Sequence, residues 1–527
     1  MSSIPSHSAE AGKTILGHPR GLFVLFFAEM WERFSYYGMR ALLIFYLVQH
    51  WMYSDSEASV IYGAYTALVY ITPVIGGYLA DRYLGQRKAV LFGAVLLTFG
   101  HFLMAFEGDG GQQDPAMNVF WLALSFIIVG SGFLKGNISV IVGQLYPRTD
   151  IRRDPAYTIF YMGINLGAAL GAIIAGWLGQ SYGWKYGFGA AGVGMLLGLI
   201  VFMWGKPLLM GRGESSNPVR LTQPVMGVKF EWVLYFLSFL GVGLVWVLIQ
   251  YQSLVGGLLM AAGAILVGYV LYTAVFKLPR EDRDRIFAAM YLIFGSILFW
   301  ALFEQAGSSL NLFTDRSVDR NMFGIEVPAA VFQSINAIYI ILLAPVFAML
   351  WTMLARRGLE PSSPAKFGLG VIQLGAGFLV LVAGATAAGP GGLTPVVFIF
   401  LIYLLHTTGE LCLSPVGLSA MNRLAPAHLA GLIMGTWFFA SATGNFAAGL
   451  IAAAAGAEGA GPEQVIDVYS RVGWIAVGVG VAMIVIAPLV KRLMHLDTLK
   501  DDDHTLAGER ALAEPAAAGI HLEDERR

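Results

Sequence analysis

The chain has 527 residues, of which 57% are hydrophobic and only 13% are charged, and its formal net charge is −1. A soluble domain usually carries about 25% charged residues, so this chain has too few to cover a water-soluble protein of its size. Its net charge also differs from the basic surface of a nucleic-acid-binding protein. The single cysteine, Cys412, excludes an intramolecular disulfide framework and a multi-cysteine zinc or iron–sulfur site. The composition predicts an all-α integral membrane protein.

Apolar stretches of about 20 residues or more recur along the chain, each long enough to cross a ~30 Å hydrocarbon core as a helix. Residues 1–20 are polar and the first apolar stretch is too long for a signal-peptide core, so we expect no cleavable signal. The predicted spans are fourteen: 21–51, 57–80, 88–107, 118–146, 155–180, 184–205, 231–252, 254–276, 286–314, 326–355, 366–388, 392–420, 427–456 and 469–490.

The basic residues of the predicted loops lie mostly on one side of the membrane. If both termini are cytoplasmic, the outer side holds only Lys185, Arg316, Arg320 and Arg471. Cytoplasmic loops retain Lys and Arg, so an even number of spans with both ends inside is predicted.

Two polar stretches, 206–230 and 277–285, divide the chain. We predict five parts: a cytoplasmic N-terminus over 1–20, an N-terminal six-helix bundle over 21–205, cytoplasmic linkers with two extra transmembrane helices over 206–285, a C-terminal six-helix bundle over 286–490, and a cytoplasmic tail over 491–527.

Seven charged residues lie clearly inside the predicted spans, away from their ends. A charge at the bilayer centre costs at least about 2.5–3.5 kcal/mol on insertion scales, so such residues persist when they are paired, face a water-filled cavity or have a function. Structural salt bridges between helices would explain some of them, and an acid left without a cation would suit a proton carrier. The seven are Glu29, Glu32, Arg33, Arg40, Lys135, Glu304 and Glu410.

The first span carries the densest group. At about 100° per residue, Glu29, Glu32, Arg33, Tyr36, Tyr37 and Arg40 share one broad face of a helix. This polar stripe has too many donors and acceptors for one structural pair, so we favour the wall of a cavity.

Three motifs, in the same order, resemble those of the proton-dependent oligopeptide transporters, a branch of the major facilitator superfamily. They are Glu29-x-x-Glu32-Arg33-Phe34-x-Tyr36-Tyr37, the loop from Gly77 to Lys88 with Asp81, Arg82 and Arg87, and Phe160-Tyr161 with Asn165 and Gly167. The resemblance covers about Gly21 to Val490. It implies a major facilitator fold of two six-helix bundles plus two linker helices, and proton-coupled import of di- and tripeptides across a bacterial inner membrane.

The resemblance also implies roles for individual residues. It implies that proton coupling depends on Glu29, Glu32 and Arg33, together with Glu304 and Glu410. Two gate pairs are implied, Arg40 with Glu304 near the outer side and Lys135 with Glu410 near the inner side. The peptide-binding residues would be Tyr36, Tyr37, Arg40, Tyr70, Lys135, Asn165, Trp300, Asn336, Glu410, Ser414 and Trp437.

The loop that contains Asp81, Arg82 and Arg87 has charges that could form a latch on the cytoplasmic side. A carboxylate at a helix end pairs with arginines and with the start of a neighbouring helix, and such a bond would latch the two halves on the cytoplasmic side. A purely topological role for these charges is the alternative.

Other functions find less support in the sequence. His406 and Glu410 lie four residues apart but have no third metal ligand, and no ATP-binding motif is present, so we expect no metal or other cofactor and transport driven by the proton gradient. A proton-coupled major facilitator transporter of nitrate, an amino-acid derivative or a drug would have the same fold and is the alternative function.

A membrane hydrolase would need a nucleophile paired with a general base, so we expect that the protein is not an enzyme. The remaining expectations are peptides, protons and lipid as partners, no nucleic acid, and a monomeric functional unit.

Overall fold

The computed structural model describes residues 14–147, 150, 152–225, 227–425, 429–456 and 461–496. The predicted N-terminus before residue 14 and the predicted tail after residue 496 lie outside the described residues. The strands are two residues long and lie in loops. β1 (Thr14–Ile15) pairs antiparallel with β2 (His18–Pro19), β3 (Pro224–Val225) with β4 (Val228–Lys229), and β6 (Asn321–Met322) with β7 (Ile325–Glu326), while β5 (Val318–Asp319) runs parallel to β8 (Thr394–Pro395).

The helices of the first half begin with α1 and its π-helical end. They are α1 (Arg20–Phe45), η1 (Tyr46–His50), α2 (Asp55–Leu79), η2 (Ala80–Leu84), α3 (Gln86–Met104), α4 (Met117–Leu134), α5 (Asn137–Gln144), α6 (Arg153–Tyr182) and α7 (Trp184–Trp204). The middle of the chain forms η3 (Lys206–Leu209), α8 (Pro218–Thr222), α9 (Phe230–Gln250) and α10 (Gln252–Lys277).

The second half follows the same plan. Its helices are α11 (Arg280–Phe303), η4 (Glu304–Gly307), α12 (Ser309–Ser317), η5 (Ala329–Gln333), α13 (Ser334–Arg356), α14 (Ser363–Ala388), α15 (Val397–Leu424), α16 (Ala430–Ala455) and α17 (Pro462–Leu493). Within the described residues, thirteen helical segments are long and apolar enough to cross a membrane. The remaining predicted span, α1, carries four charged side chains in its middle and therefore lacks a continuous apolar stretch.

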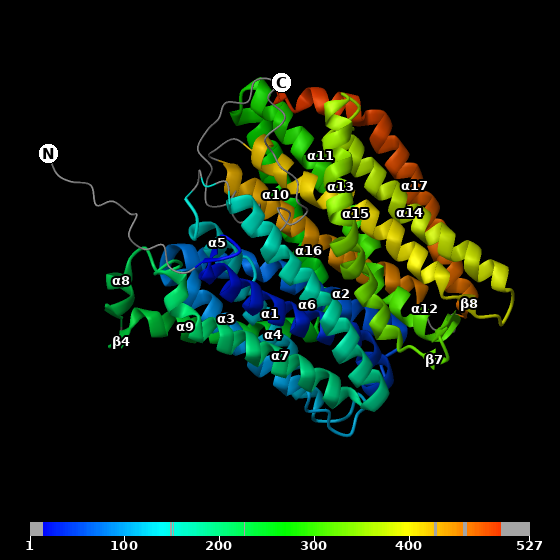
Figure 1. Ribbon diagram of the computed structural model, residues 1–527, viewed down its shortest axis with the longest axis horizontal. Helices are drawn as coiled ribbons and strands as arrows, with labels where there is room; N and C mark the ends of the chain where they lie inside the picture. The colour runs from blue at the N-terminus through cyan, green and yellow to red at the C-terminus, as the bar shows by residue number, and fades with distance from the viewer. Residues whose placement is uncertain are drawn as a thin grey trace.

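Two hydrophobic cores correspond to the two halves of the chain. One is built from α1–α7 together with α9, and the other from α11–α17 together with the second half of α10. Figure 1 shows the halves side by side, with the blue and cyan helices below and the yellow and red helices above. Helix α9 packs on α4, and α10 contacts α11 and α16. The pair α9–α10 therefore bridges the halves, and the domain boundaries drawn from the sequence stay a prediction.

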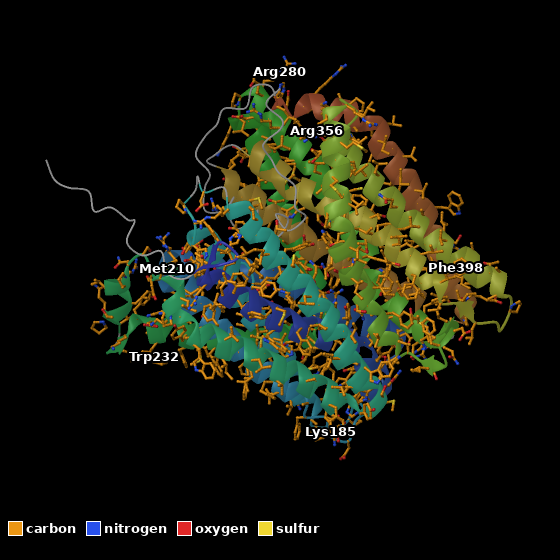
Figure 2. The ribbon with its side chains drawn as sticks, in the orientation of Figure 1. Lys185, Met210, Trp232, Arg280, Arg356 and Phe398 are labelled. Carbon is orange, nitrogen blue, oxygen red and sulfur yellow. The ribbon has the colours of Figure 1, made fainter. Side chains whose placement is uncertain are left out.

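The labelled residues indicate the two ends of the helices. Arg280, Arg356 and Met210 lie toward one end of the molecule, and Lys185 and Phe398 lie toward the opposite end (Figure 2). The orientation of these ends in the membrane stays a prediction.

Two of the predicted spans are not continuous helices. Residues 118–146 form α4 and α5, because Lys135 is extended (φ −60°, ψ 130°) and Gly136 has a φ of +85°, which a residue with a side chain adopts at a cost. Residues 286–314 are broken by the 3₁₀ turn η4, after which Ser308 leaves helical geometry (φ −123°, ψ −100°). Both stretches are single candidate membrane spans, as predicted, but apolar length gave no information on these local breaks.

The linker between the halves is bound to the loop between α2 and α3. The Arg87 guanidinium pairs with Glu214, with Nε 2.5 Å from Oε1 and Nη2 3.1 Å from Oε2, and Lys88 pairs with Glu231 at 2.7 Å. The hydrogen bond from Arg87 holds the pKa of the Glu214 carboxyl below its usual value. Asp81 accepts a hydrogen bond from Gln86 at 2.8 Å.

Arg82, the third residue of the predicted latch, lies about 5.9 Å from the ring centroids of Tyr78 and Tyr83. The observed partner of Arg87 is thus the linker, and a latch between the halves at this loop stays a prediction.

Candidate functional site

A cavity of about 200 Å³ lies between the two halves of the molecule. Helices α1, α2 and α6 and the break between α4 and α5 line it from the first half, and α11, η4, η5, α13, α15 and α16 line it from the second. Its walls carry cations from the first half, Arg33, Arg40 and Lys135, and the acids Glu304 and Glu410 from the second. The first half also contributes the acid Glu29, so its wall has three cations and one acid, and the wall of the second half has two acids.

The polar stripe of α1 holds two carboxylates around one cation. Arg33 Nε lies 2.7 Å from Glu29 Oε1 and 2.8 Å from Glu32 Oε2, and all three side chains are almost fully buried. Glu29 and Arg33 line the cavity, whereas Glu32 does not. Since one guanidinium is paired with two carboxylates, the three side chains together have one more acid than base.

Arg40 connects the two halves at one end of the cavity. Its Nη2 forms an ion pair with Glu304 of η4, and its Nε donates to the Tyr62 hydroxyl of α2 at 2.5 Å. Both charges are buried, and removing one partner of a buried pair costs about 3–5 kcal/mol. The pairing of Arg40 with Glu304 suggested by the family resemblance is present in the structure.

Two more contacts join the halves at the same end. Arg316 Nη2 donates to Asp55 Oδ1 at 2.9 Å, and Asn311 Nδ2 donates to the backbone oxygen of Ala41 at 3.1 Å. Arg316 is one of the outer-side loop residues of the topology prediction. The ion pairs found between the halves, among the residues described, are Arg40–Glu304 and Asp55–Arg316, and together they hold this end closed.

Lys135 and Glu410 lie on opposite walls of the cavity. Lys135 Nζ is 3.7 Å from the ring centroid of Tyr70, a cation–π distance. Glu410 Oε2 accepts from Asn336 Nδ2 at 3.0 Å, and the same amide also donates to Thr407 at 3.0 Å. A neutral amide thus holds the Glu410 carboxylate in place. The gate pair between Lys135 and Glu410 stays a prediction.

Four buried polar atoms of the cavity-lining residues have no hydrogen-bond partner within the described part of the chain. They are the acceptor Glu29 Oε2 in the first half and the donors Trp300 Nε1, Gln333 Nε2 and Ser414 Oγ in the second. A buried donor left unsatisfied costs about 1–3 kcal/mol, and native proteins leave few of them. The three donors lie in the second half, so they can donate to a ligand held there.

Most of the predicted binding residues line this cavity. They are Tyr37, Arg40, Tyr70, Lys135, Asn165, Trp300, Asn336, Glu410, Ser414 and Trp437. Tyr36 is not among them: it is 2% exposed and belongs to the core of the first half. Its neighbour Tyr37 occupies the wall because adjacent helical residues point about 100° apart.

Several lining residues were absent from the prediction. Among them are Tyr161, Ser139, Gln333, Tyr403 and Ser441. Helical spacing was an available signal for two of them, because Tyr161 precedes Asn165 by four residues and Gln333 precedes Asn336 by three. Ser139 reaches the cavity because of the break at Gly136, for which the sequence offered no clear sign.

Comparison with known proteins places the chain among peptide transporters. The family model described as the POT family matches residues 87–461. The peptide transporter YePEPT of Yersinia enterocolitica is 38% identical over 474 residues, which cover 85% of this chain and 90% of the relative. The dipeptide and tripeptide permease B of Salmonella typhimurium is 30% identical and covers 91% of this chain and 97% of its own length.

Solved structures agree with the sequence comparisons. A crystal structure of a mutant peptide transporter POT in complex with alafosfalin superposes with a TM-score of 0.79 at 36% identity, covering 92% of this chain and 97% of the other. The fold described above is therefore the transporter fold of that structure.

Proposed function

Because this chain belongs to the POT family, and so has the major facilitator fold, we propose that it is a proton-coupled symporter that imports di- and tripeptides by alternating access. The observation that carries this proposal is the cavity between the halves, with three cations and one acid, Glu29, on the first-half wall and the acids Glu304 and Glu410 on the second. The names of the relatives support the same substrate class.

The charges of the cavity suit a short zwitterionic peptide. Arg40 and Lys135 on the first half would attract the peptide carboxylate, and Glu410 on the second half would accept from its ammonium group. Asn165 and Asn336 would bond to the peptide backbone, while Trp300 and Ser414 would donate their unpartnered groups to it. Apolar residues between the charges, such as Ile164 and Ile340, would accept side chains of varied shape.

Proton coupling would use the acids that outnumber the cations. A proton on Glu29 or Glu32 would cancel the excess charge around Arg33, and a proton on Glu304 would release Arg40 from the gate. Since peptide carboxylate and Glu304 would compete for Arg40, substrate and proton act on one gate. Rocking of the halves about the central site would complete the cycle.

The remaining properties follow from this assignment. The protein would lie in the bacterial inner membrane with both termini cytoplasmic, consistent with the basic linkers at one end. It would need no cofactor beyond the proton gradient, carry out no catalytic reaction, and work as a monomer, because the cavity is completed by the two halves of one chain.

Uptake of radiolabelled dialanine into proteoliposomes tests the proposal. We expect an inward proton gradient to drive accumulation, a protonophore to abolish it, and unlabelled tripeptides to compete, whereas nitrate, free amino acids and sugars do not. Uptake that ignored the gradient would refute proton symport, and competition by nitrate would favour an anion transporter.

A further inference from the structure

A second cavity, of about 700 Å³, lies outside the central site, at the turn between α9 and α10. It is open to the surface and is lined by the start of α2, by α4, by both linker helices and by the end of α16. The elements come from the first half, the linker and the second half. The cavity lies at the same end of the molecule as the Asp55–Arg316 ion pair, since Glu57 and Asp55 both belong to the first turn of α2.

The polar part of this cavity presents hydrogen-bond acceptors. Glu57 uses only Oε2 in its bonds to Ser54, so Oε1 remains available. Gln250 and Gln252 donate their Nε2 groups to the backbone oxygens of Trp246 and Ile249, both at 2.7 Å, which leaves their side-chain oxygens as acceptors. Among the described residues that line the cavity, Glu57 is the one charged side chain. The wall therefore selects a cationic group rich in N–H donors.

Aromatic and apolar side chains form the rest of the wall. The rings of Tyr53 and Trp121 lie 6.5 Å apart at 63°, beside the acceptors, and aromatic faces attract ammonium groups. Further along the helices the lining becomes apolar, with Val60, Phe446 and Leu450. Met260 and Leu450 are 75% and 51% exposed on the outer surface of the helices, where a membrane protein meets lipid chains.

We propose that this cavity binds one phospholipid with a primary ammonium headgroup, phosphatidylethanolamine, in the leaflet at this end of the molecule. The ammonium donates to Glu57 and to the two glutamine oxygens beside the aromatic pair. The phosphate stays outside, because the wall offers it no cation, and an acyl chain lies against Met260 and Leu450. A choline headgroup has no N–H donors, and an anionic headgroup is repelled by Glu57.

The bound lipid would favour the closed form of this end. Helices α2 and α16 approach so closely that a Cβ on Gly63 would lie 2.8 Å from Gly449 Cα. Opening of this end must separate α2 from α16, and the residues that these two helices contribute to the cavity wall would then move apart. A ligand that binds only the assembled wall stabilises the conformation in which the wall is assembled.

Native mass spectrometry of the purified full-length chain tests the site, with phosphatidylethanolamine, phosphatidylcholine and phosphatidylglycerol of identical acyl chains. We expect one phosphatidylethanolamine to be retained at least about tenfold more tightly than either other lipid, a difference of about 1.4 kcal/mol. Soluble phosphoethanolamine should not displace it, which assigns binding to the lipid.

Two variants assign the lipid to this cavity. Gly257 lines the cavity and a Cβ there meets no atom within 4 Å, so Gly257→Leu should fill it, and Glu57→Gln should remove its charge. Both should lower retention at least about fivefold. Gly268→Leu is the matched control, on the same helix with equally open space, and should retain the lipid. Equal retention of the three lipids, or unchanged binding in both cavity variants, would overturn the proposal.

Discussion

The acids in and beside the central cavity differ in the side chains that they contact. Glu304 is paired with a buried arginine, Glu29 and Glu32 share one, and Glu410 is held by the neutral amide of Asn336. Loss of charge at each position therefore has a different consequence. At Glu410 the loss of charge removes an attraction for the substrate, and no buried cation loses an ion-pair partner. The effect on binding can therefore be measured without a large effect on folding.

We predict that Glu410→Gln raises the KM for dialanine about 10- to 100-fold, because a charged hydrogen bond to the peptide ammonium contributes about 1.5–3 kcal/mol. Initial uptake rates over a range of dialanine concentrations would measure it. Thr407→Val is the control: it removes the other partner of Asn336 and leaves the carboxylate. Normal KM in the Glu410 variant would remove Glu410 from the binding site.

We predict that Arg33→Ala abolishes gradient-driven uptake but retains some exchange of dialanine across the membrane. The substitution removes the cation that both Glu29 and Glu32 contact, and breaking a buried ion pair changes the balance of charges, so we expect coupling to the gradient to be lost. Counterflow and gradient-driven uptake would be compared in one preparation, with the exposed Arg357→Ala as control. Equal loss of both activities would indicate a defect in folding or binding instead.

At the scale of elements, the breaks in helices position the site. Lys135 stands at the end of α4, where the helix stops, and Glu304 starts the 3₁₀ turn after α11. A break frees backbone groups and lets a side chain point into the cavity, and short 3₁₀ stretches within long helices often mark hinges. Broken helices at the centre of a transporter are expected near its substrate site.

We predict that Gly136→Ala lowers stability by about 1 kcal/mol and weakens dialanine binding. A Cβ at Gly136 meets no neighbour, so the cost in stability comes only from the backbone φ of +85°. If the backbone of the variant moved to relieve this strain, the adjacent Lys135 would be displaced. Gly189→Ala in α7 is a matched control with equally open space and should be neutral or stabilising. Thermal unfolding and binding by calorimetry would measure both, and equal effects of the two substitutions would contradict the strain at Gly136.

At the scale of the whole molecule, one end of the cavity is closed by contacts between the halves. The buried Arg40–Glu304 pair lies near the cavity, the Asp55–Arg316 pair lies at the surface, and α2 crosses α16 at Gly63 and Gly449. A surface ion pair contributes about 0–1 kcal/mol, so the buried pair and the close packing of helices contribute more to closure. This end must open for peptide to enter from outside.

We predict that Gly63→Val separates the halves at this end and lowers uptake, because its side chain would collide with the Gly449 backbone. Spin labels at positions 185 and 397, in a Cys412→Ser background, would report longer distances between the halves. Gly435→Val, where a Cβ meets no neighbour within 4 Å, should leave the distances unchanged. An unaltered distance distribution in the Gly63 variant would show that this crossing does not limit closure.

The positions of the helices could be predicted from the sequence because a membrane imposes a simple rule. A span needs about 20 apolar residues with its backbone bonded internally, and the predicted ranges agree with the observed helices within a few residues at most ends. The same rule makes Arg33, Lys135 or Glu410 conspicuous, since a charge in an apolar run is costly. Functional residues without charge, such as Gln333 and Tyr403, carried no such signal.

By itself the sequence determined the membrane class, the spans and the small set of charged residues within them, because each follows from the local cost of burying polar groups. Composition and spacing did not show which charges meet: the Arg40–Glu304 pair was implied only by the family resemblance, and the tertiary structure shows it. Only the tertiary structure places Tyr36 in the core instead of the cavity and pairs Arg87 with Glu214 of the linker. These outcomes depend on the packing of segments far apart in the chain, and neither hydropathy nor local spacing contains that information.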